Sequence, residues 1–352
     1  MRDGMVIVGA GEAGARAALA LREVGWAGPV TLVGDEPHAP YERPPLSKAV
    51  MTSEALPSPP FILRDGQLEE HDVVLERGAK VTAIDRTAHS VTLADGRRLR
   101  YARLLLATGS TARRLQLPGA QHVLYLRNFD EALALRLRLK PGGRIVVIGG
   151  GFIGLELAAS ARARGVDVTL LELAPRLLTR GVSSQMAERI AAKHRDAGVD
   201  MRVGVGIAAI ESDGEGNSVL LSDGARIRCD GIVAGIGAAP ETRLAETVHL
   251  TIENGIRVDA KLRTDDPDVY AAGDCCSFPH PLYGDRRIRL EAWRNALDQA
   301  NVVARNLAGG QEVYSAVPWF WSDQYDQTLH IAGLVDEGRT TKIGRASCRE
   351  RV

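Results

Sequence analysis

VVIGGGFIGLELA, at residues 146–158, and VIVGAGEAGAR, at residues 6–16, share one pattern. In each, a short apolar run typical of a buried strand leads into Gly-x-Gly-x-x-Gly and then into a helix-forming run. Glycines at this spacing let the backbone approach the diphosphate of a dinucleotide, whose charge then faces a helix N-terminus. Two copies predict an electron relay in which one dinucleotide stays bound and the other arrives as hydride donor.

The first copy carries a complete dinucleotide fingerprint. Its glycines are Gly9, Gly11 and Gly14. A second predicted strand at residues 30–33 is followed by Asp35 and Glu36, and a carboxylate there can accept hydrogen bonds from a ribose. The alternative is a tight structural turn with no ligand, but it does not account for the strand, the helix and the acid together.

Two further predicted strands end in turn-like sequences, at residues 104–109 and 264–274. Asp274 ends the second of these predicted strands, and the sequence leaves two interpretations of this residue open. Its carboxylate suits hydrogen bonding to polyol hydroxyls, or it caps a following helix.

The second copy uses Gly149, Gly151 and Gly154, and the strand predicted at residues 166–171 ends in Glu172. A carboxylate at this offset accepts from the 2′- and 3′-hydroxyls of a ribose and repels a 2′-phosphate. We therefore expect NADH to be preferred to NADPH. Arg176 and Arg180 follow closely and would weaken that preference.

Composition places the chain among ordinary globular proteins. It has 352 residues, enough for two or three domains, with 45% apolar and 25% charged residues. Acidic and basic residues balance at 44 each, which gives no indication of a nucleic-acid partner. No apolar run reaches the length of a membrane span, and the N-terminus enters a strand without a signal-peptide pattern. The 4 cysteines show no metal or CxxC spacing, so we expect no metal site and a reduced, cytoplasmic setting.

The last ten residues, IGRASCRERV at 343–352, differ from the rest. They are polar and aperiodic, and they match the translation of a common sequencing adapter, so we expect an artefact that begins near Lys342. The alternative is a natural basic tail. We exclude this segment from the fold prediction.

Beyond the glycine motifs, several stretches are distinctive. They are VGDEPHAPYERPPLSK (33–48), YLRNFDEALALR (125–136), DVYAAGDC (268–275), RLEAWRNALDQAN (289–301) and PWFWSDQYD (318–326). On these motifs the chain, from Val6 to about Val335, resembles the pyridine-nucleotide-dependent flavoprotein reductases. It is most similar to the ferredoxin reductases, of putidaredoxin-reductase and rhodocoxin-reductase type, that serve Rieske dioxygenases and bacterial cytochromes P450.

The resemblance implies an α/β fold with two Rossmann-like dinucleotide-binding domains, as in glutathione reductase. The FAD-binding domain is expected at residues 1–112 and 242–312, with the NAD(H)-binding domain inserted at 113–241. Residues 313–342 would then begin an α/β C-terminal interface domain that is cut short.

The resemblance also implies the site residues. Those expected to bind FAD are Gly9, Gly11, Ala13, Gly14, Asp35, Arg43, Lys48, Val81, Arg127, Gly273, Asp274 and Trp293. Those expected to bind NADH are Gly149, Gly151, Ile153, Gly154, Glu156, Glu172 and Gly237. Lys48, Glu156 and Trp321 are the expected catalytic residues. We hypothesise that Lys48 and Glu156 pair when no nicotinamide is bound, and that Trp321 lies near the flavin. The alternatives are a solvated lysine, a glutamate on a helix face and ordinary packing tryptophans.

Residues 34–56 contain no cysteine, unlike the flavin-adjacent segment of disulfide reductases and NADH peroxidases of this fold. Electrons would therefore leave the flavin directly, to a [2Fe–2S] ferredoxin or alternatively a rubredoxin.

The alternative functions are those of an NADH oxidase, a quinone or monodehydroascorbate reductase, or an NADH-sensing interaction protein related to apoptosis-inducing factor. We expect a monomer or weak homodimer. Arg286, Arg287 and Arg289 could help to dock an acidic ferredoxin, or be ordinary solvated arginines.

Overall fold

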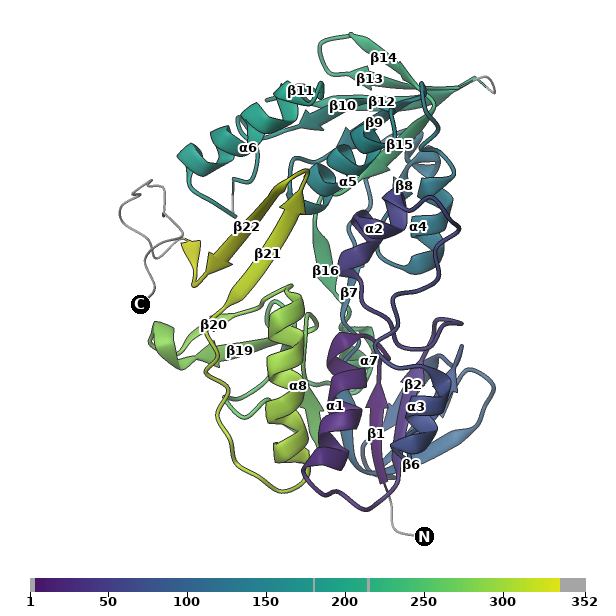
Figure 1. The fold of residues 1–352 in the computed structure, drawn as a ribbon. Coiled ribbons are helices and arrows are strands. Elements are labelled where there is room, and N and C mark those ends of the chain that lie inside the picture. The colour runs from purple at the N-terminus through teal and green to yellow at the C-terminus, as the bar shows by residue number, and fades with distance from the viewer. Residues whose placement is uncertain (1–3, 180, 214–215, 336–352) are drawn as a thin grey trace, which may run out of the picture.

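The computed structural model describes residues 4–179, 181–213 and 216–335, so the expected adapter segment at 343–352 and Arg180 lie outside it. Figure 1 shows a lower lobe that contains the N-terminus and an upper lobe built on a second sheet. Each lobe has a largely parallel sheet covered by helices. This confirms the predicted α/β fold with two Rossmann-like units.

The lower lobe is built on a seven-stranded sheet. Its strands are β1 (Gly4–Val8), β2 (Val30–Gly34), β3 (Val74–Arg77), β4 (Val81–Asp85), β5 (Ser90–Leu93), β6 (Arg98–Leu106) and β18 (Val269–Ala271). They lie in the order β3-β2-β1-β6-β5-β4, and β18 also pairs with β6. Every residue of β1 is buried, because a parallel strand is covered on both faces.

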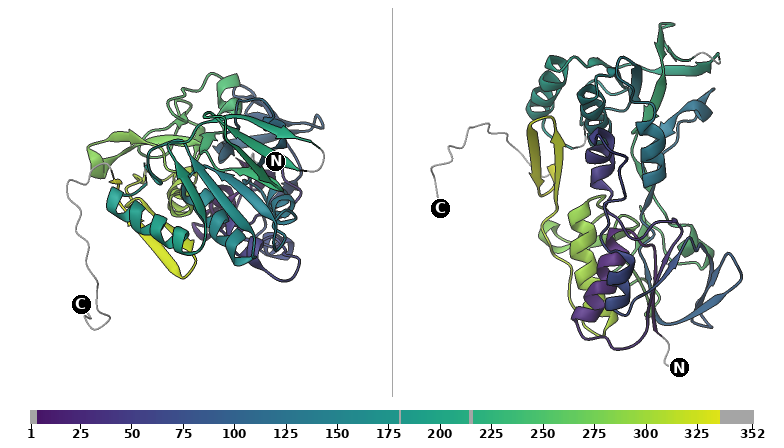
Figure 2. Two further views of the ribbon diagram at one scale, coloured as in Figure 1. Left: turned by 90° about the horizontal axis from the view of Figure 1, so that it is seen from above. Right: turned by 45° about the vertical axis from the view of Figure 1, so that its right-hand side comes forward.

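Helices α1 (Glu12–Glu23) and α8 (Trp293–Leu307) pack against each other beside this sheet (Figures 1 and 2). The lower lobe is completed by α3 (Asp65–Glu70), α7 (Arg243–Thr247), β17 (Ile256–Arg257), β19 (Cys276–His280), η3 (Pro281–Tyr283) and β20 (Arg286–Ile288). Since the next element after Asp274 is the strand β19, that residue does not cap a helix, and this alternative from the sequence is wrong.

The upper lobe repeats the plan with a five-stranded parallel sheet. Its strands are β8 (Leu124–Tyr125), β9 (Arg144–Ile148), β10 (Asp167–Glu172), β11 (Asp200–Val203) and β15 (Gly231–Ala234), and its helices are η2 (Ala120–His122), α4 (Phe129–Arg136), α5 (Phe152–Ala163) and α6 (Ser184–Asp196). The strand order is β11-β10-β9-β15-β8. A separate antiparallel sheet contains β12 (Ile207–Ser212), β13 (Asn217–Leu221) and β14 (Arg226–Cys229).

Several segments join the lobes. Strands β7 (Ser110–Ala112) and β16 (Ala238–Pro240) run antiparallel where the chain enters and leaves the upper lobe. The short helices η1 (Pro44–Ser47) and α2 (Ala49–Thr52) follow β2 in sequence but pack against α4 and α5. Arg136 of α4 fixes α2 by donating to the carbonyl oxygens of Val50 and Met51. As a result Lys48, between η1 and α2, reaches α5.

The described chain ends in a hairpin of β21 (Trp319–Gln324) and β22 (Gln327–Ala332). Its first strand contacts α5 and α8, and Figures 1 and 2 show the hairpin between α6 and α8. Among the described residues, no helix is long and apolar enough to cross a membrane.

Candidate functional site

A cavity of about 1500 Å³ runs between the lobes, and both glycine loops line it. Pockets for one small molecule usually measure roughly 300–1,000 Å³, so this cavity is larger than one such ligand needs. Most of the predicted site residues meet here. Those that line the cavity are Gly9, Gly11, Ala13, Asp35, Arg43, Lys48, Val81, Arg127, Gly149, Gly151, Ile153, Glu156, Glu172, Gly237, Gly273, Asp274, Trp293 and Trp321.

The first glycine loop leaves room for a ligand at the start of α1. A Cβ added at Gly11 would meet no protein atom within 4 Å, although Gly11 is the N-cap residue and faces the cavity. No side chain caps α1, so its first N–H groups are available to an anion. The empty space and the free donors fit a dinucleotide diphosphate.

The second loop is built in the same way around Gly151, the N-cap residue of α5. A Cβ added there would approach one protein atom, the Gly235 oxygen, at 4.0 Å, and again no side chain caps the helix. The two glycine motifs therefore produce two equivalent anion-binding helix N-termini in one cavity.

The third glycine of each motif was expected to contact a cofactor, but it does not line the cavity as the other two glycines do. Gly14 and Gly154 do not line the cavity. A Cβ on Gly14 would lie 1.9 Å from the Gly9 oxygen, and one on Gly154 would lie 2.1 Å from the Gly149 oxygen. These glycines allow close packing of helix and loop.

Glu172 stands at the end of β10, beside the second loop. Its carboxylate accepts hydrogen bonds from the backbone N–H groups of Gly150 and Ala174, both at 2.7 Å, so its orientation is fixed. Arg176 is not free to bind a phosphate. Its guanidinium donates to the carbonyl oxygens of Leu177, Leu178 and Thr179.

At the equivalent place in the first site, the two acids differ. Glu36 accepts from the Tyr41 hydroxyl and, at 2.6 Å, from Arg43. Asp35 is exposed and lines the cavity, and no described residue donates a hydrogen bond to its carboxylate. Of the two, Asp35 is therefore the one available to a ribose.

A polar cluster lies in the middle of the cavity. Arg127 binds Asp274 at 3.1 Å, and Ser110 donates to the same carboxylate oxygen at 3.1 Å. Burial lowers the pKa of Arg127, an effect that Asp274 opposes. Among the described residues, the Nε of Arg127 is buried without a hydrogen-bond partner, whereas the Trp293 indole lies beside the buried Glu12 carboxylate. A buried donor without a partner is costly, so the Arg127 Nε fits a ligand that supplies an acceptor.

Lys48 and Glu156 form an ion pair with Nζ 3.1 Å from Oε1. Lys48 is paired and Glu156 is 3% exposed, so the alternative of a solvated lysine and a glutamate on a helix face is wrong. Two hydroxyl groups that the sequence did not point out complete the contacts of this carboxylate: Ser47 donates to Oε2 at 2.5 Å and Ser322 to Oε1 at 2.6 Å.

Trp321 adjoins this ion pair and contacts two further tryptophans. The Trp321 ring lies edge-on to Trp293 with centroids 5.7 Å apart, and stacks on Trp319 at 5.5 Å. Lys48 Nζ lies 5.7 Å from the Trp321 ring centroid. Trp321 and Trp293 also line the cavity.

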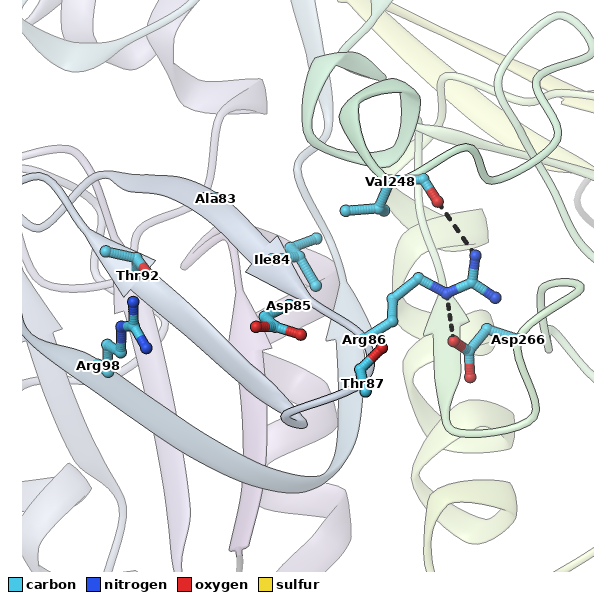
Figure 3. A pocket seen from close by; sticks show the side chains of 9 residues that line it. All are labelled: Ala83, Ile84, Asp85, Arg86, Thr87, Thr92, Arg98, Val248 and Asp266. Carbon is cyan, nitrogen blue, oxygen red and sulfur yellow. Dashed lines mark hydrogen bonds and ion pairs between the residues drawn. The ribbon is translucent and has the colours of Figure 1, made fainter.

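A second, smaller pocket of about 700 Å³ lies at β4 and β5 (Figure 3). It contains none of the predicted site residues. Arg86 at its edge is engaged by Asp266, at 2.5 Å, and by the carbonyl oxygen of Val248, at 3.1 Å. We therefore place the functional site in the larger cavity.

This fold and cavity define a reductase that uses two dinucleotides, and comparison with known proteins agrees. Residues 3–300 match the family model described as "Pyridine nucleotide-disulphide oxidoreductase". The chain belongs to the pyridine nucleotide-disulphide oxidoreductase family.

Its relatives define a narrower group. The chain is 43% identical to rhodocoxin reductase of Rhodococcus erythropolis, over 97% of this chain and 81% of the relative. It is 42% identical to the ferredoxin--NAD(+) reductase component of the p-cumate 2,3-dioxygenase system of Pseudomonas putida, over 95% and 82%. A solved covalent putidaredoxin reductase–putidaredoxin complex superposes with a TM-score of 0.90 at 40% identity, over 95% of this chain and 82% of that chain.

The family name mentions a disulfide, but the described cysteines form no thiol relay at the cavity. Cys229, Cys275 and Cys276 are free and buried, and none lines the cavity. Burial raises the pKa of the Cys275 and Cys276 thiols, so both stay protonated near neutral pH. This agrees with direct exit of electrons.

The arginines suggested for docking a partner are not loose. Arg287 donates to the carbonyl oxygens of Val258 and Ser277, and Arg289 pairs with Glu291 at 2.6 Å. These two side chains stabilise the fold around β19 and β20, so the expectation that they dock a ferredoxin loses its support.

Proposed function

We propose that this chain is an FAD-dependent NADH:ferredoxin oxidoreductase of an oxygenase system. It takes electrons in pairs from NADH and passes them singly to a small [2Fe–2S] ferredoxin. The observation that carries the proposal is one continuous cavity that joins two equivalent glycine loops to the Lys48–Glu156 ion pair. Similarity to a ferredoxin--NAD(+) reductase component and to putidaredoxin reductase supports ferredoxin as the acceptor. When bound, FAD supplies the chemistry that converts one hydride into two single electrons.

The first loop would hold FAD. Gly9, Gly11 and Ala13 would face its diphosphate and Asp35 its ribose, with Val81 at the adenine end. The unpartnered Nε of Arg127 supports this assignment, since it is buried in the cavity wall. The other proposed FAD contacts are Arg43, Lys48, Gly273 and Asp274.

The second loop would hold NADH, with its diphosphate over the N-terminus of α5. Gly149, Gly151 and Ile153 would contact the diphosphate, and Gly237 would border the nicotinamide half. Glu156 would lie near the nicotinamide, because it lines the cavity beyond the first turn of α5. Trp321 would adjoin the flavin on the side of the one-electron acceptor.

Glu172 would select NADH, so Glu172→Ala is expected to reduce the preference for NADH over NADPH by about tenfold. Removing the carboxylate abolishes its repulsion of a 2′-phosphate, worth ~1 kcal/mol or more at close range. The measurement is the ratio of kcat/KM values for the two nucleotides. Arg176→Met is the control and should leave the ratio unchanged, because its guanidinium binds backbone carbonyls. An unchanged ratio in Glu172→Ala would show that another group reads the ribose.

The proposed function is tested by an anaerobic absorption spectrum before and after NADH, followed by addition of a [2Fe–2S] ferredoxin with cytochrome c as final acceptor. We expect a flavin spectrum that NADH bleaches, and rapid cytochrome c reduction that requires the ferredoxin. Rubredoxin in place of ferredoxin tests the alternative acceptor. A colourless protein, or a reduced flavin that neither carrier reoxidises, would contradict the proposal.

The cytoplasm is the proposed location. It is supported by the three described cysteines, which are free and buried. Reduced cysteines are typical of that compartment.

A further inference from the structure

A chain of hydrogen bonds leads from the surface of the C-terminal hairpin to Glu156. The Tyr325 hydroxyl lies 3.1 Å from His194 Nδ1, and His194 Nε2 lies 2.9 Å from Gln324 Oε1. Gln324 Nε2 donates to Ser322 Oγ at 3.0 Å, and Ser322 donates to Glu156 Oε1 at 2.6 Å. The chain thus joins α6, β21 and α5.

The hydrogen-bonding capacities of these groups fix the direction of the chain. Burial lowers the pKa of His194, so its ring is neutral near neutral pH and carries one N–H. Because the Gln324 oxygen can only accept, that hydrogen is on Nε2, and Nδ1 accepts from Tyr325. Ser322 receives from Gln324, so its hydrogen goes to Glu156. Every member donates toward the carboxylate.

The chain has almost no access to water. His194 is 0% exposed, Ser322 1%, Glu156 3% and Gln324 7%. A buried polar network is stable only when its members are satisfied, so each group is held in one orientation by the next. Loss of one donor therefore affects the whole chain.

Ser322 and Lys48 contact the same oxygen of Glu156, whereas Ser47 contacts the other. If Lys48 turns toward a bound cofactor, Ser322 still donates to Oε1 and Ser47 to Oε2. The carboxylate then keeps a hydrogen bond on each oxygen and stays in place. A buried carboxylate left without donors would move or take up a proton.

We propose that Ser322, Gln324 and His194 are positioning residues that hold Glu156 for the reaction of the nicotinamide, with Tyr325 as the outer end of the chain. This inference rests on the proposed function. It assigns the hairpin β21–β22 a role in hydride transfer from NADH, in addition to the role near the one-electron acceptor that we propose for Trp321.

The test compares Ser322→Ala and Gln324→Met with Lys193→Met in the FAD-loaded protein. Lys193 binds Asp326 at 2.6 Å and its Nζ lies 5.9 Å from the centre of the Tyr325 ring, so it touches the outer end of the chain but none of the three positioning residues. Rapid mixing with NADH gives the limiting rate of flavin reduction and the dissociation constant of NADH separately. We expect the two chain variants to lose about tenfold in limiting rate, since small misplacement of a reacting pair is costly. Their NADH dissociation constants, and both parameters of Lys193→Met, should stay within about twofold of the unmodified protein.

The second readout is the tautomer of His194, from nitrogen NMR of histidine-labelled protein, with Tyr325→Phe to assign and perturb Nδ1. We expect hydrogen on Nε2, and an Nδ1 resonance that shifts in Tyr325→Phe. Hydrogen on Nδ1, chain variants that react as fast as the unmodified protein, or an equal loss in Lys193→Met would each overturn the inference. If the unmodified protein is not reduced by NADH, the proposed function fails. The tautomer then still decides whether the chain points toward Glu156.

Discussion

A Gly151→Val protein is expected to keep its FAD and stay yellow, yet to bind NADH at least about 100-fold more weakly. Gly151 has φ −84° and ψ −179°, which valine adopts without strain. Its Cβ would approach only the Gly235 oxygen, at 4.0 Å, so the fold tolerates the side chain. The added atoms occupy the space in front of α5 that a diphosphate must enter. Loss of its charge-assisted hydrogen bonds, ~2–3 kcal/mol, corresponds to about 100-fold.

The measurement is an anaerobic titration of the flavin absorbance with NADH. Gly11→Val is the matched variant of the first loop, where an added Cβ meets no protein atom within 4 Å, and it should yield a folded, colourless protein. Gly154→Ala is the steric control. Its Cβ would lie 2.1 Å from the Gly149 oxygen, so it should lower the melting temperature. If Gly151→Val is reduced at the same NADH concentrations as the unmodified protein, the second loop does not hold the nucleotide.

The sequence alone predicts those parts of the site that depend on short-range pattern. Each glycine loop is encoded within about a dozen residues, since strand, turn and helix follow one another directly, and the acid after the next strand comes at a fixed offset. The glycines, Asp35 and Glu172 are therefore identifiable from local spacing. Local spacing does not predict that Gly14 and Gly154 pack against their own loops and do not line the cavity. This position depends on how closely each helix packs on its loop.

The rest depends on contacts between distant segments. Ser322 donates to Glu156 across 166 residues, and no local pattern indicates that a serine after Trp321 points toward α5. Arg176 follows Glu172 by only a few residues, and the sequence suggested a phosphate ligand, but its guanidinium turns back to its own loop. Asp274 likewise pairs with Arg127, which belongs to another part of the chain. Side-chain direction was the missing information in all three cases.

Lys48→Met is expected to slow flavin reduction by NADH about 100-fold, the usual cost of removing one charged group that stabilises charge at the reacting centre.

Lys48→Met is also expected to lower the stability of the folded protein. Methionine fills a similar volume but leaves the buried Glu156 carboxylate without its ion-pair partner, which costs about 3 kcal/mol when no other group compensates. Ser47 and Ser322 still donate to the carboxylate, so the measured loss should be smaller than this. Rapid mixing measures the rate, and denaturant unfolding of the FAD-loaded protein measures the stability.

The double variant Lys48→Met/Glu156→Gln separates the two effects. A neutral amide needs no cation, so the double variant should regain the stability that the single variant lost, while its rate of flavin reduction stays low. Lys80→Met is the matched control, because Lys80 lines the same cavity at an exposed position and binds none of these groups. Recovery of rate together with stability would mean that Lys48 serves only to neutralise Glu156. Glu156→Gln alone shows how much rate the loss of the carboxylate costs. A double variant with recovered stability but a rate well below that of Glu156→Gln would assign the lysine itself to the reacting centre, since the cation would then be missed only when the nicotinamide reacts.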